Sequence, residues 1–140
     1  MTKFFKQGND TRCGPIAAMN IDSWRGFNVY RDECPLYEKA LCWSAKKGTT
    51  RAAFSKWIGQ RAKRITWKKF KDALEHGRLV VVLTRRINLH QKNGHIYIIT
   101  EITSGCTAIN LIEGEKRSYV TRQLMVGLLK RSHCWIVERA

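Results

Sequence analysis

Cys13 is the residue of this sequence best placed for nucleophilic chemistry. Gly14 and Pro15 follow it and lead into an apolar stretch of helix formers, which predicts a helix over residues 14–24. Proline is tolerated in the first turn of a helix, because the amide that it lacks would be unpaired there. Cys13 would then stand at the amino terminus of that helix, where partial positive charge favours a thiolate, and Arg12 adds a cation beside it.

A thiol nucleophile needs a base, and four histidines could supply one. His76 falls at the end of a predicted helix, His90 in a polar loop, and His133 before the last predicted strand. His95 opens the most regular β-branched segment of the chain. A strand holds its side chains rigidly, which a general base requires, so we expect His95 to be the base.

Two amide side chains could complete such a site. With a turn at residues 103–105, antiparallel pairing would bring Asn110 next to His95, and an Asn beside an imidazole fixes its orientation. Gln7 stands six positions before Cys13 and could donate to an oxyanion, together with the backbone amide of Cys13. Each residue also has a structural interpretation: Cys13 and His95 as core residues, Asn110 as a bridge between backbone groups, and Gln7 as part of a mobile terminus.

The elements that must position these residues divide the chain into two halves. The first half predicts helices over residues 14–24, 32–46, 50–60 and 66–76. The second half predicts strands over 79–83, 95–102, 106–112, 118–122 and 134–137, with a helix over 123–130. Helices followed by an antiparallel sheet indicate an α+β fold, and we expect one domain over residues 1–140.

Composition narrows the classes further. The longest apolar run, residues 79–83, is too short for a membrane span, and no secretory signal is seen at the amino end. We therefore expect a soluble, cytoplasmic protein without membrane insertion. The five scattered cysteines argue against a disulfide framework, and only the His133-Cys134 pair hints at zinc. We expect the four cysteines other than Cys13 to be buried and inert, and we expect no metal and no organic cofactor.

A strong positive charge is the other feature of the composition. The formal net charge is +15, and one region is especially basic: Lys56, Arg61, Lys63, Arg64, Lys68, Lys69 and Lys71, with Arg85, Arg86 and Lys92 later. This region is either a solvated helical face or a docking surface for nucleic acid or an acidic protein. No nucleic-acid recognition motif accompanies it, and the tryptophans fall at spacings typical of a core.

The segment Gln7-Gly-Asn-Asp-Thr-Arg-Cys13-Gly14 resembles the amino-terminal motif of the bacteriocin-processing, double-glycine leader peptidases. Gly94-His95-Ile-Tyr resembles their histidine motif, and Asn110 falls where that family usually carries an aspartate. The resemblance implies a papain-like fold, Cys13 as nucleophile, His95 as base, Asn110 as orienting residue and Gln7 as oxyanion donor. Family members are commonly part of a peptide exporter, whereas this chain contains no such part, so their leader specificity is not carried over.

Two hypotheses follow from the sequence. The first is a free-standing papain-like cysteine peptidase that hydrolyses a peptide or isopeptide bond in a peptide or protein substrate through a Cys13 thioester. The second is a basic binding or inhibitor protein on the same scaffold, with an idle catalytic set, that engages nucleic acid or an acidic partner. The oligomeric state is not indicated by the sequence.

Overall fold

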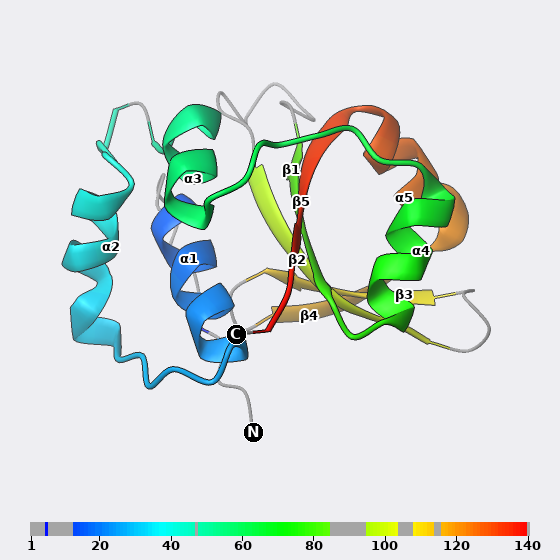
Figure 1. Ribbon diagram of the computed structural model, residues 1–140, viewed down its shortest axis with the longest axis horizontal. Helices are drawn as coiled ribbons and strands as arrows, with labels where there is room; N and C mark the ends of the chain where they lie inside the picture. The colour runs from blue at the N-terminus through cyan, green and yellow to red at the C-terminus, as the bar shows by residue number, and fades with distance from the viewer. Residues whose placement is uncertain are drawn as a thin grey trace.

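The computed structural model describes residue 5 and residues 13–46, 48–84, 95–103, 108–113 and 116–139, with residues 103, 108–113 and 116–119 described as backbone only. Figure 1 shows a sheet at the centre with helices on both sides. The helices are α1 (Cys13–Trp24), α2 (Cys34–Ala40), α3 (Arg51–Ile58), α4 (Trp67–Glu75) and α5 (Arg122–Lys130), and a short 3-10 helix, η1 (Arg31–Glu33), precedes α2.

The sheet is antiparallel throughout and has the strand order β4-β3-β2-β1-β5. Its strands are β1 (Leu79–Thr84), β2 (His95–Thr103), β3 (Ala108–Glu113), β4 (Lys116–Thr121) and β5 (Ser132–Val137). The last strand in the sequence therefore pairs with the first, and β1 lies between β2 and β5. The predicted α+β fold, with a helical first half and an antiparallel sheet in the second, is confirmed.

β1 explains why the sheet carries helices on both faces. Leu79 and Val81 face a cluster that includes α1 and α3, whereas Val80 and Val82 face a cluster that includes α4 and α5. All four residues are fully buried. A strand buried on both faces reads as a continuous apolar run, which is why this segment shows no alternation in the sequence.

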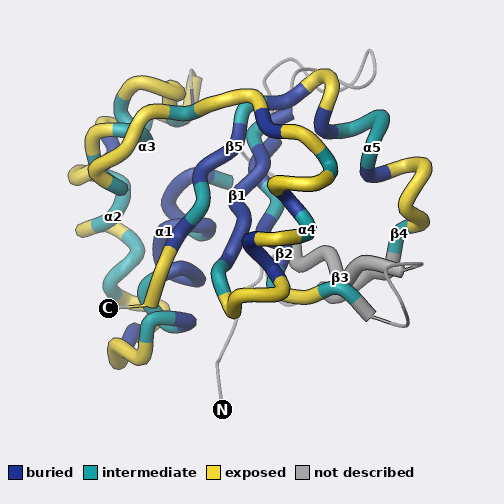
Figure 2. Tube along the Cα trace, turned by 45° about the vertical axis from the view of Figure 1, so that its right-hand side comes forward, coloured by how far each residue is buried: buried dark blue, intermediate teal, exposed yellow. Residues whose placement is uncertain are grey.

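Helix α1 is enclosed more completely than the other helices, as the dark blue segment in Figure 2 shows. Ala17, Ala18 and Ile21 pack toward the sheet. Met19 packs with Phe5 and Val29 in a separate cluster. Tyr37 of α2 donates a hydrogen bond to Asp22 of α1 at 2.7 Å. The sheet, α2 and the segment at Phe5 therefore fix the helix from different sides.

One predicted helix, over residues 32–46, is wrong in its second half. Pro35 lies in the first turn of α2, where proline is tolerated, but the helix ends at Ala40. Cys42 adopts a positive φ of 52°, which an α-helix does not accommodate, and a bridge then joins Ser44 to Gly48. The other predicted helices and strands in the described residues agree with the structure to within about two residues at most ends.

Candidate active site

Cys13 and His95 each open an element. Cys13 is the first residue of α1, is half-buried and packs against the cluster that includes Ile96, the neighbour of His95. His95 is the first residue of β2 and is 9 % exposed. α1 and β2 are in contact, and the amino end of α1 and the start of β2 lie toward the same end of the molecule in Figure 1. The elements on which the predicted nucleophile and base lie are therefore in contact. Tyr97, whose ring lies beside that of His95, packs against the cluster on the α4 and α5 side, so this contact does not by itself join the side chains of Cys13 and His95.

The surroundings of His95 restrain it on two sides. Its ring centroid lies 4.6 Å from that of Tyr97, with the ring planes at 62°. Its carbonyl oxygen accepts a hydrogen bond from Thr84 Oγ1 at 3.4 Å, across the β1–β2 pair. An imidazole at the start of a paired strand and beside an aromatic ring has few orientations open to it, which suits a general base.

Gly14 lets the chain beside Cys13 pack closely against Thr49. A Cβ atom added at Gly14 would lie 2.5 Å from Thr49 Cβ and closer still to Thr49 Oγ1. Real side chains do not tolerate such a contact, so no larger residue fits without displacing one of the two segments. The glycine that follows Cys13 in the sequence therefore has a structural reason.

A buried side chain ties the amino-terminal segment to α1. Asn20 Oδ1 accepts a hydrogen bond from the Phe5 amide at 2.6 Å, and Asn20 Nδ2 donates to the Phe5 carbonyl at 3.3 Å. Asn20 is 1 % exposed and Phe5 is 2 % exposed. This pair of bonds, called here the Asn20 clamp, fixes the backbone at Phe5 against the helix that begins at Cys13. Gln7, the predicted oxyanion donor, lies outside the described residues, as do Arg12 and His90.

The structure contradicts the expected neighbourhood of Asn110. The register of β2 and β3 pairs Asn110 with Glu101, which lies six positions along β2 from His95. Six residues of a strand span about 20 Å, too far for an amide to reach the imidazole. Even a turn at residues 103–105 would pair Asn110 with residue 98 rather than with His95, and the observed pairing of Thr103 with Ala108 moves Asn110 further still, to Glu101. Asn110 is therefore not next to His95 across the ladder.

Sequence reasoning missed Glu113 as a candidate near His95. Ile98 pairs with Ile112, so continuing this register by one residue places Glu113 opposite Tyr97. His95 and Glu113 then occupy diagonal positions of the β2–β3 ladder. The sequence could have indicated this residue, because a turn at residues 103–105 pairs residue 102 with 106 and so already places residue 113, rather than 110, opposite His95.

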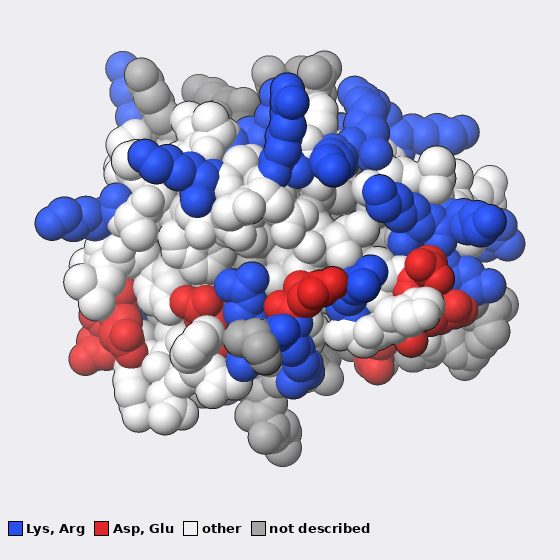
Figure 3. Space-filling view, viewed as in Figure 1, with Lys and Arg blue, Asp and Glu red and all other residues white. Residues whose placement is uncertain are grey.

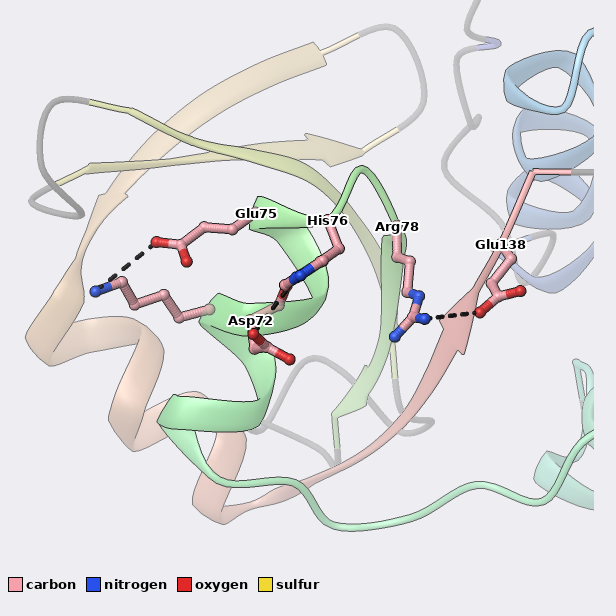
Figure 4. A network of polar contacts seen from close by, with 6 residues as sticks. Asp72, Glu75, His76, Arg78 and Glu138 are labelled. Atoms are coloured by element: carbon pink, nitrogen blue, oxygen red, sulfur yellow. Dashed lines mark hydrogen bonds and ion pairs between the residues drawn. The ribbon is translucent and has the colours of Figure 1, made fainter.

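Two of the other histidines have structural contacts of their own. His76 follows α4, and its Nδ1 donates to the Asp72 carbonyl at 2.7 Å and lies 3.4 Å from Asp72 Oδ1. Figure 4 shows this pair beside the Arg78–Glu138 ion pair at 3.0 Å and the dashed contact of Glu75 at 3.8 Å from Lys71. His133 of β5 instead faces the Arg51 guanidinium, with both ring nitrogens within 3.2 Å of Nη1.

The remaining described cysteines differ from one another. Burial raises the pKa of the Cys134 thiol to about 12, so this residue is inert at neutral pH, as predicted. Cys42 is exposed and Cys34 is only half-buried, so the prediction of buried thiols is wrong for these two. Cys106 lies outside the described residues. Among the residues that the structure describes, no three His, Cys, Asp or Glu side chains gather as a metal site would require.

Comparison with known structures identifies proteins that share this fold. No family model matches the chain, and no curated protein sequence matches it either. The peptidase domain of Streptococcus ComA, a bifunctional ABC transporter involved in a quorum-sensing pathway, superposes with a TM-score of 0.74 at 12 % identity, over 98 % of each chain. The peptidase domain of Streptococcus mutans ComA gives a TM-score of 0.54 at 11 % identity, over 97 % of this chain and 99 % of the other.

The chain therefore has the α+β, papain-like fold of these peptidase domains, as the sequence resemblance implied. None of the helices in the described residues is long and apolar enough to cross a membrane.

Proposed function

We propose that this protein is a cysteine peptidase that cleaves a peptide or isopeptide bond, with Cys13 as nucleophile and His95 as base. The observation that supports the proposal is the contact between the helix that begins at Cys13 and the strand that begins at His95, within a fold shared with peptidase domains. Cys13 opens a buried helix, His95 opens the strand that this helix contacts, and the fold is that of peptidase domains. A thiol at a helix amino terminus with a histidine from another element is the usual arrangement of a cysteine nucleophile.

The proposed reaction runs in two stages. His95 takes the proton of the Cys13 thiol, and the thiolate attacks the substrate carbonyl carbon to form a tetrahedral oxyanion. The Cys13 backbone amide and the Gln7 side chain would donate to that oxyanion. The carbon–nitrogen bond breaks, His95 returns the proton to the leaving amine, and a thioester remains on Cys13. Water, deprotonated by His95, then hydrolyses the thioester and restores the thiol. No cofactor enters these steps.

A thiol-directed electrophile tests the nucleophile directly. We expect it to label Cys13 in the wild type at pH 8, as located by mass spectrometry, and to leave Cys134 unlabelled because its pKa is raised to about 12. Cys42 is exposed and provides the comparison rate for an ordinary thiol. Cys13→Ala should lose hydrolysis by at least about 10³-fold. Labelling of Cys13 no faster than that of Cys42 would count against an activated nucleophile.

The base is tested with a matched pair of histidine variants. His95→Ala should lower kcat by at least about 10³-fold and slow the labelling of Cys13. His76→Ala, which removes a histidine bonded within its own helix end, should retain wild-type hydrolysis. Equal losses in the two variants would mean that His95 has no special role.

For the residue that orients His95, the register favours Glu113 over Asn110. Glu113→Gln should lower kcat by at least about tenfold with little change in KM, and Glu113→Asp should recover part of the loss. Asn110→Ala serves as the control on the same strand and should remain close to the wild type. A greater loss in Asn110→Ala than in Glu113→Gln would overturn the assignment of Glu113 and favour Asn110.

The alternative function is a basic binding protein with an idle catalytic set. The observation that favours it is the segment of residues 51–71, which contains eight Lys or Arg and no Asp or Glu. Binding of nucleic acid or an acidic protein that weakens with salt, survives Cys13→Ala and occurs without any hydrolysis by the wild type would support it. Because a nucleophilic thiol must stay reduced, we also propose that the protein works in a reducing compartment such as the cytoplasm.

A further inference from the structure

A ridge of basic side chains runs beside the candidate site. We define the basic ridge as Arg61, Lys63, Arg64, Lys68, Lys69, Lys130 and Arg131, all of which are exposed. The four ion pairs recorded between described residues involve none of them. In Figure 3, Lys and Arg gather along the upper part of the molecule, over α3, the α3–α4 connection and α5, whereas the visible Asp and Glu lie lower.

The backbone of the ridge is held firmly against β5. Lys63 and Cys134 exchange backbone hydrogen bonds of 2.9 and 2.7 Å. Gln60 Nε2 donates to the Ile136 carbonyl at 2.8 Å, and the Ile136 amide donates to Gln60 Oε1 at 3.1 Å. Arg64 Nη1 in turn donates to the Lys130 carbonyl, which ties the ridge to the end of α5. The backbone that carries these positive charges is therefore fixed, so binding of a ligand does not have to include the free-energy cost of ordering this segment.

The register of the sheet places the ridge close to His95. Thr84 of β1 pairs with His95 on one side and with Ser132 on the other. Ser132 therefore lies two strand spacings, about 10 Å, from His95. Arg131 directly precedes Ser132, and Lys63 pairs with Cys134 two residues further on. A polypeptide bound at Cys13 and His95 needs to extend only a few residues to reach the ridge.

We infer that the basic ridge binds an acidic segment of the polypeptide substrate, a few residues away from the bond that is cleaved. This inference rests on the proposed peptidase function and names the class of its substrate. Like charges concentrated on one rigid surface raise the free energy of the unbound protein, and an acidic segment would neutralise them. The ridge then contributes binding energy and orientation, while Cys13 and His95 act on the bond.

The aromatic residues near the ridge favour a polypeptide over a nucleic acid. Trp67 is half-buried, with the Phe70 ring at 5.4 Å and the Arg122 guanidinium over its own ring at 5.1 Å. Phe70 is fully buried. Between residues 60 and 71, the described chain thus offers no exposed aromatic ring on which a base could stack, although stacking is the usual means of holding single strands.

The test measures binding separately from cleavage, with the Cys13→Ala protein. Three fluorescein-labelled probes are compared by anisotropy: a peptide of ten glutamates, a peptide of ten glutamines, and a single-stranded thymidine oligonucleotide with ten phosphates. We expect the glutamate peptide to bind most tightly and the glutamine peptide not to bind. In the Cys13→Ala background, Lys63→Glu/Lys69→Glu should weaken binding of the glutamate peptide by at least about fivefold.

A matched variant controls for net charge. Lys39→Glu/Lys46→Glu reverses two exposed lysines outside the ridge and changes the total charge by the same amount. It should weaken binding much less. Equal weakening by the two double variants would mean that only net charge attracts the peptide, and tighter binding of the oligonucleotide would assign the ridge to nucleic acid. Either result overturns the inference. Because the assay needs no catalysis, an inactive wild type would refute the proposed peptidase without altering the binding result.

Discussion

Helix α1 and the two helices on the other face of the sheet, α4 and α5, are held in different ways. Eight of the twelve residues of α1 are buried, and it contains no Lys or Arg. Only three of the nine residues of α4, and two of the nine of α5, are buried, and both helices carry exposed basic side chains. α1 is packed from several directions, whereas α4 and α5 each lay one apolar face on the sheet.

The difference shows how the molecule separates two requirements. The proposed nucleophile, Cys13, needs a fixed position, and α1 supplies it because tertiary contacts surround this helix. A charged surface needs solvent, and α4 and α5 supply it because most of their residues lie outside the core. If this interpretation holds, substitutions in α1 should disturb the molecule more than comparable substitutions in α4 or α5.

The largest effect on stability is expected at the Asn20 clamp. Asn20→Leu keeps the volume but leaves the buried amide and carbonyl of Phe5 without their partner. The free energy of unfolding should fall by about 2–4 kcal/mol, measured by urea denaturation. A loss below about 0.5 kcal/mol would show that the amino-terminal segment is not fixed through this bond pair, and the enclosure of α1 would then need another cause.

A glycine pair gives the next largest contrast, because the two sites should respond with opposite signs. Gly14→Ala forces a contact with Thr49 and should destabilise the protein by about 1–3 kcal/mol. Gly127 of α5 has nothing within 4 Å of an added Cβ, so Gly127→Ala should stabilise by about 0.5–1 kcal/mol through helix propensity. Thermal unfolding of both variants checks the signs, and a stabilised Gly14→Ala would contradict close packing beside Cys13.

The smallest destabilisation should come from removing the cap of α4. Thr66 accepts a hydrogen bond from the Lys69 amide at 3.2 Å, so Thr66→Ala should cost about 1 kcal/mol of unfolding free energy. Because α4 is remote from Cys13, the labelling rate of Cys13 should stay the same, whereas Gly14→Ala should change it. A change in labelling by Thr66→Ala would show that the two faces of the sheet are not independent.

Local sequence patterns were sufficient for most elements and for the order of the fold. Thr50, Thr66 and Thr121 mark the helix starts because each accepts a hydrogen bond from a first-turn amide, and such caps are readable in a sequence. The apolar run at β1 and the β-branched run at β2 likewise predict strands from sequence alone. The end of α2 did not, because a positive φ at a non-glycine residue, Cys42, is set by context.

The site was harder to predict wherever it depends on register. Asn110 was assigned to His95 although a turn at residues 103–105 pairs residue 95 with 113, and the observed β2–β3 pair extends further and contains a register shift between Ile99 and Glu101. A shift of this kind changes every partner beyond it and leaves no distinct sequence pattern. The contact partners of Gly14 and Asn20 could not be predicted from the sequence either, because Thr49 and Phe5 come close to them only through tertiary folding.

The segment that carries part of the basic ridge also protects a sheet border. β5 ends the strand order, so its outer backbone groups would otherwise be open to pairing with a second molecule. Lys63 and the Gln60 side chain occupy those groups at Cys134 and Ile136. Replacing Gln60 with Ala would therefore leave part of this border unpaired, and repulsion between the flanking cations would then be the remaining barrier to aggregation through β5.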